Sequence, residues 1–255
     1  MSTGVTVVIP CYHSEAYLEK TADEIIAVTK MHPDLRMHFI LINDCSPDGT
    51  FQVISRLCEK YPGQVTGIDL ARNAGQAQAK MAAFGFISDG ITVFMDDDGQ
   101  HDPRGIFPLL SGIRKGYDIV YAQFPETRES FFRRVGSRMA GLLMLAFTKK
   151  PPGLRITSFF ALSPAALAEM KTYRCRHPFI GGRLFQKGYK ALGVPVPHRE
   201  RAHGKSGYTL RKLVKRTAAL TVLYRIPMKQ SDPPPFRIRL VIREDGTRET
   251  YPADP

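Results

Sequence analysis

Three consecutive carboxylates, Asp96, Asp97 and Asp98, follow the apolar run Ile91–Met95. The run predicts a buried strand, and negative charges crowded at its end raise one another's pKa and are costly unless a cation neutralises them. Oxygen ligands at a strand end suit Mg²⁺ or Mn²⁺, which then has open positions for a diphosphate. The alternative is a solvated acidic turn in which Asp102 caps the following helix.

The elements that must position these carboxylates alternate along the first 125 residues. Short β-branched runs predict strands at 5–9, 37–42, 65–70, 91–95 and 117–121, and amphipathic runs predict helices near 15–30, 50–61, 76–88 and 103–115. This alternation predicts an α/β fold with a mostly parallel, Rossmann-like sheet flanked by helices and with ligands at the carboxyl ends of the strands. Polar residues follow four strands, at 10–15, 43–49, 72–75 and 96–98. The missing glycine-rich dinucleotide and P-loop motifs argue against an oxidoreductase or a P-loop NTPase.

Length and charge bound the classes of protein that fit. The 255 residues suit one α/β domain with a small appendage. A net charge of +12 predicts attraction to phosphates, nucleic acid or an anionic membrane surface. The four cysteines are scattered and are expected to be reduced, in a cytosolic protein without a secretory signal. Because no apolar stretch reaches the roughly 18–20 residues that span a bilayer, we expect any membrane association to be peripheral, re-entrant or supplied by a partner.

The second half of the chain has a different pattern. Segments 129–150 and 208–226 combine apolar and basic residues, as helices at a membrane interface do, although core helices with a solvated basic face are the alternative. The tail, residues 228–255, reads as a Pro-rich linker followed by a β-hairpin with a type I′ turn at Asp245-Gly246. We expect this hairpin to pair with the main sheet, another subunit or a lipid surface.

Five motifs together resemble the family-2 inverting glycosyltransferases. They are VVIPCY at 7–12, INDCSPDGT at 42–50, ARNAG at 71–75, MDDDGQ at 95–100 and HRERAHGKSGY at 198–208. More narrowly, the chain is similar to the polyprenyl-phosphate branch, which includes the dolichol-phosphate and undecaprenyl-phosphate sugar transferases. The resemblance implies a GT-A fold over residues 1–227, including the interfacial helices, with 228–255 as the tail.

The resemblance also implies roles for individual residues. Asp44 would accept a hydrogen bond from the nucleobase, Asp96 and Asp98 would hold Mg²⁺ or Mn²⁺ against the diphosphate, and Gln100 would face the sugar. The residues implied to bind the nucleotide-sugar are Pro10, Tyr12, Glu15, Asp44, Arg72, Asp96, Asp97 and Asp98, and those implied in catalysis are Asp96, Asp98, Gln100, Arg201 and Lys205. The chain departs from the family pattern at His13, Asn43 and Gly207, where Asn, Asp and Lys are usual.

One further departure concerns the acceptor. Several relatives carry an Asp general base just before the segment that matches residues 157–162, and here Arg155 or Ile156 stands in its place. A sugar hydroxyl needs such a base, whereas a phosphomonoester is already ionised near neutral pH. The alternative is a base elsewhere, at Asp102, Glu126 or Glu200. The residues expected to meet the acceptor phosphate or the membrane are Arg133, Arg134, Arg138, Arg155, Ser158, Arg201, Lys205 and Ser206.

These observations favour a metal-dependent inverting transferase that moves a sugar from a nucleotide-sugar to a polyprenyl phosphate, bound peripherally at the cytoplasmic face of the membrane. The alternative acceptor is a sugar hydroxyl of a lipid-linked glycan in surface polysaccharide synthesis. A basic nucleic-acid-binding protein is a remote alternative, because the chain has no known nucleic-acid-binding motif. A catalytically silent scaffold is a further alternative. The sequence leaves open the sugar, the nucleobase, and the need for a separate membrane subunit or a homo-oligomer.

Overall fold

The computed structural model describes residues 3–125, 150–197, 199 and 235–252. The first half contains β1 (Thr3–Cys11), α1 (Leu18–Lys30), β2 (Leu35–Asn43), α2 (Thr50–Lys60), β3 (Val65–Leu70), α3 (Gln76–Ala83), β4 (Ile91–Phe94), the 3₁₀-helix η1 (Pro103–Gly105), α4 (Ile106–Arg114) and β5 (Ile119–Gln123). The second half contains β6 (Phe160–Leu162), α6 (Pro164–Thr172), α7 (Ile180–Gln186), β7 (Ala191–Pro195), β8 (Ile238–Ile242) and β9 (Arg248–Thr250).

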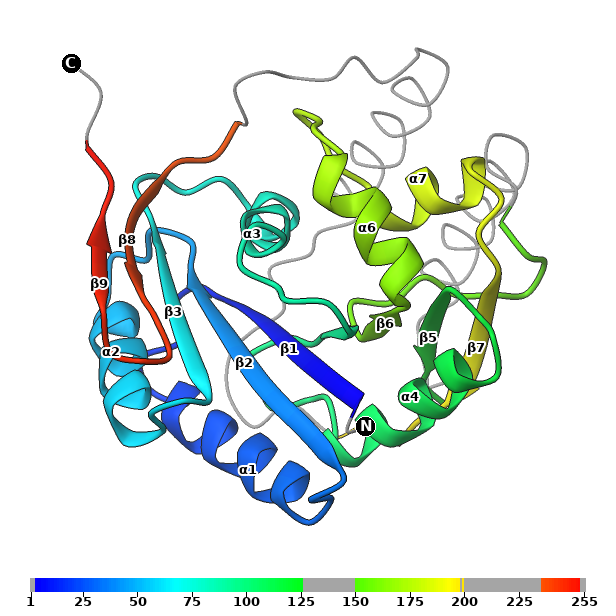
Figure 1. The fold of residues 1–255 in the computed structure, drawn as a ribbon, viewed down its shortest axis with the longest axis horizontal. Coiled ribbons are helices and arrows are strands. Elements are labelled where there is room, and N and C mark those ends of the chain that lie inside the picture. The colour runs from blue at the N-terminus through cyan, green and yellow to red at the C-terminus, as the bar shows by residue number, and fades with distance from the viewer. Residues whose placement is uncertain (1–2, 126–149, 198, 200–234, 253–255) are drawn as a thin grey trace, which may run out of the picture.

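The nine described strands form one mixed sheet in the order β7-β5-β6-β4-β1-β2-β3-β8-β9 (Figure 1). At its centre β4, β1, β2 and β3 are parallel, so their carboxyl ends meet along one edge. β6 lies antiparallel between β4 and β5. The segment just before β6 therefore reaches the sheet at the edge where β4 ends.

Helices cover both faces of the sheet, and each face has its own core. α1, α2 and α4 pack on one face with Val5, Val7 and Ile9 of β1. α3, α6 and α7 pack on the other face with Val8. Figure 1 shows the two groups on opposite sides of the strands. The alternation along β1 follows from the two-residue period of a strand, and burial on both faces explains why the strands read as continuous apolar runs.

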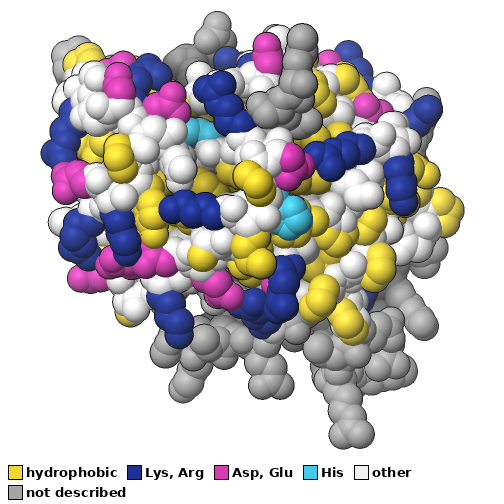
Figure 2. Space-filling model, turned by 60° about the horizontal axis from the view of Figure 1, so that its bottom comes forward, with side chains coloured by type: hydrophobic (Ala, Val, Ile, Leu, Met, Phe, Trp, Pro, Cys, Tyr) yellow, Lys and Arg dark blue, Asp and Glu magenta, His cyan; other side chains and the backbone are white. Residues whose placement is uncertain are grey.

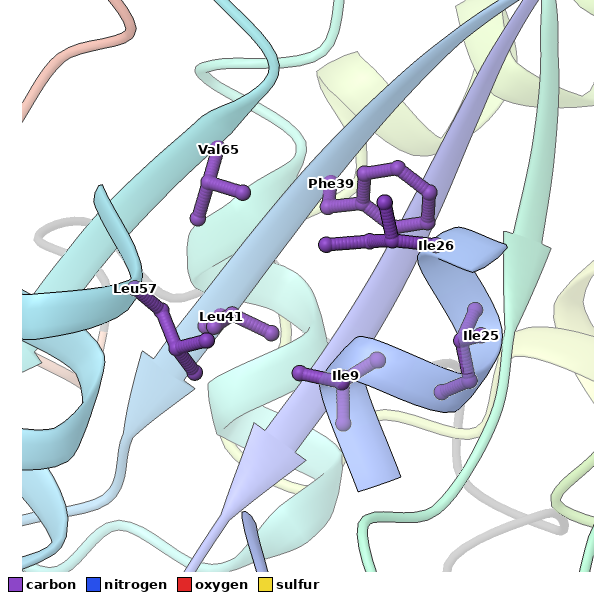
Figure 3. Close-up of a pocket in the computed structure, with 8 residues that line it drawn as sticks. Ile9, Ile25, Ile26, Phe39, Leu41, Leu57 and Val65 are labelled. Carbon is purple, nitrogen blue, oxygen red and sulfur yellow. The ribbon is translucent and has the colours of Figure 1, made fainter. Parts of the chain in front are cut away.

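A small gap in the first core lies between α1, α2 and three strands. Figure 3 shows the side chains that line it, which come from α1, α2, β1, β2 and β3. The gap is too small for a water molecule, and its lining is entirely apolar. It is a packing feature of the core, lined by Ile9, Ala22, Ile25, Ile26, Phe39, Leu41, Leu57 and Val65.

The nine elements expected in the first 125 residues are all present, with ends shifted by a few residues. α3 ends at Ala83 rather than near residue 88, and the helix expected at 103–115 divides into η1 and α4. Asp102 does cap this helix, since its carboxylate accepts a hydrogen bond from the amide of Arg104 at 3.0 Å. The segments expected to be interfacial helices, 129–150 and 208–226, lie almost entirely outside the described residues.

The expected C-terminal hairpin is present as β8 and β9, and of the three surfaces considered it pairs with the main sheet, against β3. The predicted type I′ turn is wrong. Among the described residues Gly246 has a positive φ of 82° but Asp245 does not, whereas a type I′ turn needs both. The amide of Gly246 donates to Arg243 O, and Arg243 N donates to Thr247 O, which makes a three-residue loop with glycine at the left-handed position. The expected boundary at residue 228 lies outside the described residues and stays a prediction.

Charge is distributed unevenly along the chain. On the face seen in Figure 2, which lies over α1, basic side chains alternate with acidic and apolar ones. Segments 126–149 and 200–234, by contrast, carry 13 of the 36 Lys and Arg residues but only 4 of the 24 Asp and Glu residues. Within the described part of the chain, no helix is both long and apolar enough to cross a bilayer.

Candidate active site at the carboxyl edge of the sheet

The carboxylates that follow β4 are the meeting point of several elements that are distant in the sequence. Asp96 Oδ1 accepts a hydrogen bond from Gln76 Nε2 of α3 at 2.6 Å, and Asp96 Oδ2 accepts one from Ser158 Oγ, just before β6. Asp97 Oδ2 accepts a hydrogen bond from Ser14 Oγ in the loop after β1. Side chains from two strand ends and one helix therefore converge on two adjacent residues, as the strand order predicts.

Asp96 lies in a positive environment. Lys80, one helical turn after Gln76, is only 6% exposed, and its Nζ lies 5.9 Å and 5.5 Å from the ring centres of Phe94 and Phe160. Burial raises the pKa of Asp96, but the charge of Lys80, the neighbouring His101 ring and hydrogen bonds from Ser158 and Gln76 outweigh it and hold the pKa below its ordinary value. The carboxylate is therefore ionised in the folded protein at neutral pH.

His101 holds the backbone of the segment that carries Asp96. Its Nδ1 accepts the amide N–H of Asp96 at 3.0 Å, so a neutral ring carries its proton on Nε2, which lies 3.8 Å from Asp96 Oδ2. The ring is buried and stacks on Phe159 and Phe124, with centroid distances of 4.8 Å and 5.5 Å. These contacts fix the backbone at the end of β4.

The partners of Asp97 differ from those of Asp96, because the Asp97 side chain faces the loop after β1. Its Oδ2 also accepts a weaker hydrogen bond from the amide of Tyr12 at 3.3 Å. Burial and the nearby charge of Asp96 raise the pKa of Asp97 to about 7, despite its hydrogen bonds. The Asp97 contacts hold the neighbouring loop in place, where Tyr12 is 45% exposed and packs edge-on against His13.

The third carboxylate, Asp98, accepts a hydrogen bond from the amide of Gln100 at 3.1 Å. The carbonyl of Gln100 in turn accepts the amide of Arg199 at 3.1 Å, and the Arg199 guanidinium lies 3.3 Å from Asp102 and contacts Glu24. Arg199 therefore anchors the start of the expected basic motif beside the acidic turn. The expected residues Arg201, Lys205 and Ser206 lie outside the described residues.

Asp44, after β2, has a different set of partners. Its two carboxylate oxygens accept the backbone amides of Ala74 and Gly75 at 2.7 Å and 2.9 Å, and Asn73 Nδ2 donates to its carbonyl at 3.1 Å. Burial raises the pKa of Asp44, and the two amide hydrogen bonds partly offset this. Asp44 thus joins the loops after β2 and β3. The structure does not test its expected contact with a nucleobase.

Backbone geometry at this edge is unusual. His13 and Cys45 are the non-glycine residues with positive φ in the described part of the chain, at 56° and 52°. His13 follows β1 and Cys45 follows β2, and these two strands are neighbours in the sheet. Such conformations persist only where surrounding contacts hold them. Gly75, with φ of 84°, begins α3 in a conformation that suits glycine.

The remaining expected donor residues lie at the same edge. Glu15 Oε2 accepts the amide of Gly49 at 2.8 Å at the start of α2, and Asp48 accepts the amide of Glu15. Pro10 is buried at the end of β1, in register with Ile42. Arg72 Nη2 donates to Pro235 O at 3.0 Å, so its guanidinium also contacts the C-terminal tail.

Of the expected acceptor residues, Ser158 and Arg155 are described. Ser158 contacts Asp96, as above, while the exposed Arg155 donates from its guanidinium to the carbonyl of Phe124 and from its backbone amide to Gln123 Oε1 at 3.1 Å. Arg133, Arg134 and Arg138 lie outside the described residues, as do the alternative bases Glu126 and Glu200. Asp102, the third alternative base, is almost fully buried and paired with Arg104 and Arg199.

The donor set at this edge fits a hard divalent cation in part. Asp96 and Asp98 offer carboxylate oxygens within three residues, which is the ligand type that Mg²⁺ and Mn²⁺ prefer. No three His, Cys, Asp or Glu side chains converge on one point among the described residues. A metal held by two carboxylates would take its other ligands from water and a substrate diphosphate, as Mg²⁺ usually does.

Three residues near the carboxylates were not expected from the sequence. They are Gln76, Lys80 and His101. Gln76 and Lys80 are four positions apart and so share one face of α3, but a lysine on an amphipathic helix normally faces water.

Comparison with known proteins identifies the class. Residues 6–175 match the model of glycosyl transferase family 2, and the chain belongs to this family. The prediction from the strand-end motifs is therefore confirmed.

An undecaprenyl-phosphate 4-deoxy-4-formamido-L-arabinose transferase of Edwardsiella ictaluri is 29% identical over 210 residues, which are 82% of this chain and 64% of that one. A protein of the same name from Photorhabdus laumondii is 27% identical over 226 residues, 88% of this chain and 69% of that one. The chain thus spans 64% of the length of the first of these relatives.

Solved structures show the same fold. Glucosyl-3-phosphoglycerate synthase from Mycobacterium tuberculosis, determined with Mn²⁺, UDP and phosphoglyceric acid, superposes with a TM-score of 0.63 at 18% identity, over 99% of this chain and 88% of that one. Mannosyl-3-phosphoglycerate synthase from Rubrobacter xylanophilus gives a TM-score of 0.59 at 16% identity, over 87% and 73%. The expected GT-A fold is confirmed.

Proposed function

We propose that the protein is a metal-dependent inverting glycosyltransferase that moves a sugar from a nucleotide-sugar donor to a polyprenyl phosphate. The observation that carries this proposal is the convergence of the loop after β1, the start of α3 and the segment before β6 on the carboxylates after β4. Family membership makes this edge the expected donor site, and the relatives are named for undecaprenyl phosphate.

The donor half of the site is built from the chain's own residues. Asp96 and Asp98 would hold Mg²⁺ or Mn²⁺ against the donor diphosphate, and the bound ion would stabilise the negative charge of the leaving nucleoside diphosphate. The loops after β1 and β2, which contain Tyr12 and Asp44, would hold the nucleoside. Solved structures of the same fold contain Mn²⁺ and UDP, which supports this assignment.

The acceptor half favours a phosphate over a hydroxyl. Ser158 lies against Asp96, and Arg155, a cation, stands three residues earlier in the sequence, where a general base would be expected. A phosphomonoester has a second pKa of about 6 and attacks without a base once cations position it. Asp102 is a poor base, because Arg104 and Arg199 pair with it and, with other contacts, hold its pKa below its ordinary value.

Membrane contact would come from the basic segments 126–149 and 200–234. Their excess of Lys and Arg suits the anionic headgroups of the cytoplasmic face, where polyprenyl phosphate would be met. Arg133, Arg134, Arg138, Arg201 and Lys205 are the residues proposed to contact headgroups or the acceptor phosphate.

Transfer assays test the proposal directly. The purified chain is incubated with Mn²⁺ and radiolabelled UDP-, GDP-, CDP- or dTDP-sugars, together with undecaprenyl phosphate or a lipid-linked saccharide. We expect label in undecaprenyl phosphate with one donor class, and NMR of the product should show inversion. Product in the lipid-linked saccharide alone would replace the phosphate acceptor with a hydroxyl, and no product with either would overturn the proposal.

A further inference from the structure

The C-terminal hairpin, to which the proposed function gives no role, is joined to the loop after β2 by a chain of polar contacts. β8 pairs with β3, where Asp69 lies opposite Leu240, and the side chain of Arg239, next to Leu240, contacts Asp69. Arg239 Nε and Nη2 lie 2.6 Å and 2.5 Å from Asp69 Oδ2. The other oxygen, Oδ1, accepts a hydrogen bond from Asn43 Nδ2 at 2.8 Å. One buried carboxylate therefore connects the hairpin to the last residue of β2.

The chain of contacts continues beyond Asn43. Asn43 Oδ1 accepts the amide of Ser46 at 3.2 Å, and Ser46 Oγ accepts the amide of His13 at 2.8 Å. The guanidinium of Arg239 is thereby linked to the loops after both β2 and β1. These loops contain His13 and Cys45, the two residues with left-handed backbone, whose conformation needs such support.

A second link joins the tail to the loop after β3. Arg72 Nη2 donates to Pro235 O at 3.0 Å, and the amide of Ala71 donates to Arg237 O at 2.9 Å. Cys45 Sγ in turn lies 3.7 Å from Ala71 O. The tail therefore contacts the loop after β3 directly, and that loop contacts Cys45 next to Asp44, through contacts independent of Arg239.

Burial gives these contacts their strength. Asp69 is 1% exposed, and a buried carboxylate is strongly destabilising when it loses its counter-charge. Hydrogen bonds between guanidinium and carboxylate are charge-assisted and therefore stronger than neutral ones. Loss of Arg239 would leave Asp69 with Asn43 as its one remaining side-chain partner among the contacts above. We therefore expect Asn43, and with it the contacts to Ser46 and His13, to shift.

We propose that Arg239 and Asp69 are positioning residues of the donor site, through which the hairpin sets the loop 43–46 against the nucleoside half of the donor. This inference rests on the proposed function, which places the nucleoside at these loops. Two contacts on the far side of the hairpin, Gly63 N to Glu244 O and Arg248 to Glu59, serve only to attach it. The hairpin therefore does more than cover the edge of β3.

A matched pair of variants on the hairpin tests this role. Arg239→Gln removes the contact with Asp69. Arg243→Gln makes the same charge change on the same hairpin, but Arg243 pairs with Glu249 and lies over Phe86, away from the loops. Arg239→Lys keeps the charge with fewer donors, and serves as the test variant if Arg239→Gln does not fold.

Two measurements are made on each variant. The first is the dissociation constant for UDP, GDP, CDP and dTDP with Mn²⁺. The second is the alkylation rate of the Cys45 thiol in the ligand-free protein, located by mass spectrometry. Cys45 is partly exposed while Cys11, Cys58 and Cys175 are buried, so it reports on the loop itself.

We expect Arg239→Gln to weaken binding of the preferred nucleotide at least fivefold and to raise the Cys45 rate at least threefold, with smaller changes of the same sign in Arg239→Lys. Arg243→Gln should stay within twofold of the wild type in both. If Arg239→Gln matches Arg243→Gln while the wild type binds a nucleotide, the inference is overturned and the proposed function stands. If the wild type binds none of the four nucleotides, the proposed function is overturned, and the donor role of the hairpin with it.

Discussion

Two strand ends in this sheet carry buried or half-buried aspartates, and they use them differently. Asp44 after β2 gives both oxygens to backbone amides of one neighbouring loop. Asp96 and Asp97 after β4 contact side chains from the loop after β1, from α3 and from the segment before β6. The first aspartate holds two loops together, whereas the second group accepts side-chain hydrogen bonds from several elements.

The difference indicates which aspartates at this edge of the sheet matter for stability and which matter for activity. A carboxylate satisfied by backbone amides is fixed by the fold, and its loss should appear first in stability. Carboxylates that receive side chains, including a buried lysine nearby, are adjusted by residues whose change need not disturb the fold. Substitutions at the two ends should therefore separate activity from stability.

The largest effect is expected at Asp98. Asp98→Ala removes a proposed metal ligand and should lower transfer by at least about 100-fold, because a Lewis-acid contact contributes several kcal/mol to the transition state. Steady-state transfer assays measure this, with Asp89→Ala as control, since Asp89 pairs with Lys171 on the surface. Undiminished transfer in Asp98→Ala would point to a catalytically silent scaffold or a different metal ligand.

A smaller effect on activity is expected at Lys80. Lys80→Met keeps the apolar contact with Phe94 and Phe160 but removes the positive charge beside Asp96, so we expect transfer to fall about tenfold, or about 1.4 kcal/mol. The melting temperature should not fall, because an apolar replacement of a buried charge is often neutral or stabilising. Lys171→Met is the surface control. A variant that loses stability but keeps its transfer rate would make Lys80 a purely structural residue.

At the other strand end, Asp44→Asn should affect stability more than turnover. The amide group presents an N–H donor to one of two backbone N–H groups and leaves it unsatisfied, at a cost of about 2 kcal/mol. For a chain of this size, that corresponds to a fall in melting temperature of roughly 4–8 °C. Calorimetry measures the shift. An unchanged melting temperature would show that Asp44 does not hold the loops.

The smallest effect is expected at Asp48, in the loop after β2. Hydrogen bonds from Ser46, Thr50 and Glu15 outweigh burial and lower the pKa of Asp48 to about 2. Because the pKa is depressed in the folded state, the stabilisation is present above about pH 4 and is lost as pH falls toward 2. Asp48→Asn should lower the melting temperature by roughly 2–4 °C at pH 7, for about 1 kcal/mol. A difference from the wild type that stays constant down to pH 2 would contradict this.

Much of the fold could be predicted because the first half of the chain is regular. Long β-branched runs and amphipathic helices gave β1 to β5 and α1 to α4, and with them the edge where the polar loops meet. The second half was harder. β6 is three residues long and lies antiparallel between strands that precede it, and β7 contains Gly193 and Pro195, so neither shows a strand period.

The site divides in the same way. The carboxylates and their loops were visible as motifs, whereas Lys80 was not, because its partners Asp96 and Phe160 are brought to it only by the tertiary fold. The tail shows a further limit. Asp245-Gly246 indicated the hairpin correctly, but the turn type depended on the φ of Asp245 and not on the residue pair. The link from Arg239 through Asp69 to Asn43 needed the register of β8 against β3.

The central claim is that the carboxylates after β4 hold a divalent ion against a donor diphosphate. Calorimetric titration of UDP, GDP, CDP and dTDP, in Mn²⁺ and in EDTA, tests it on the wild type and on Asp98→Ala. The account predicts that the wild type binds one nucleotide at least tenfold more tightly in Mn²⁺ than in EDTA, and that Asp98→Ala abolishes the difference. Equal affinity of the wild type in Mn²⁺ and in EDTA would contradict it.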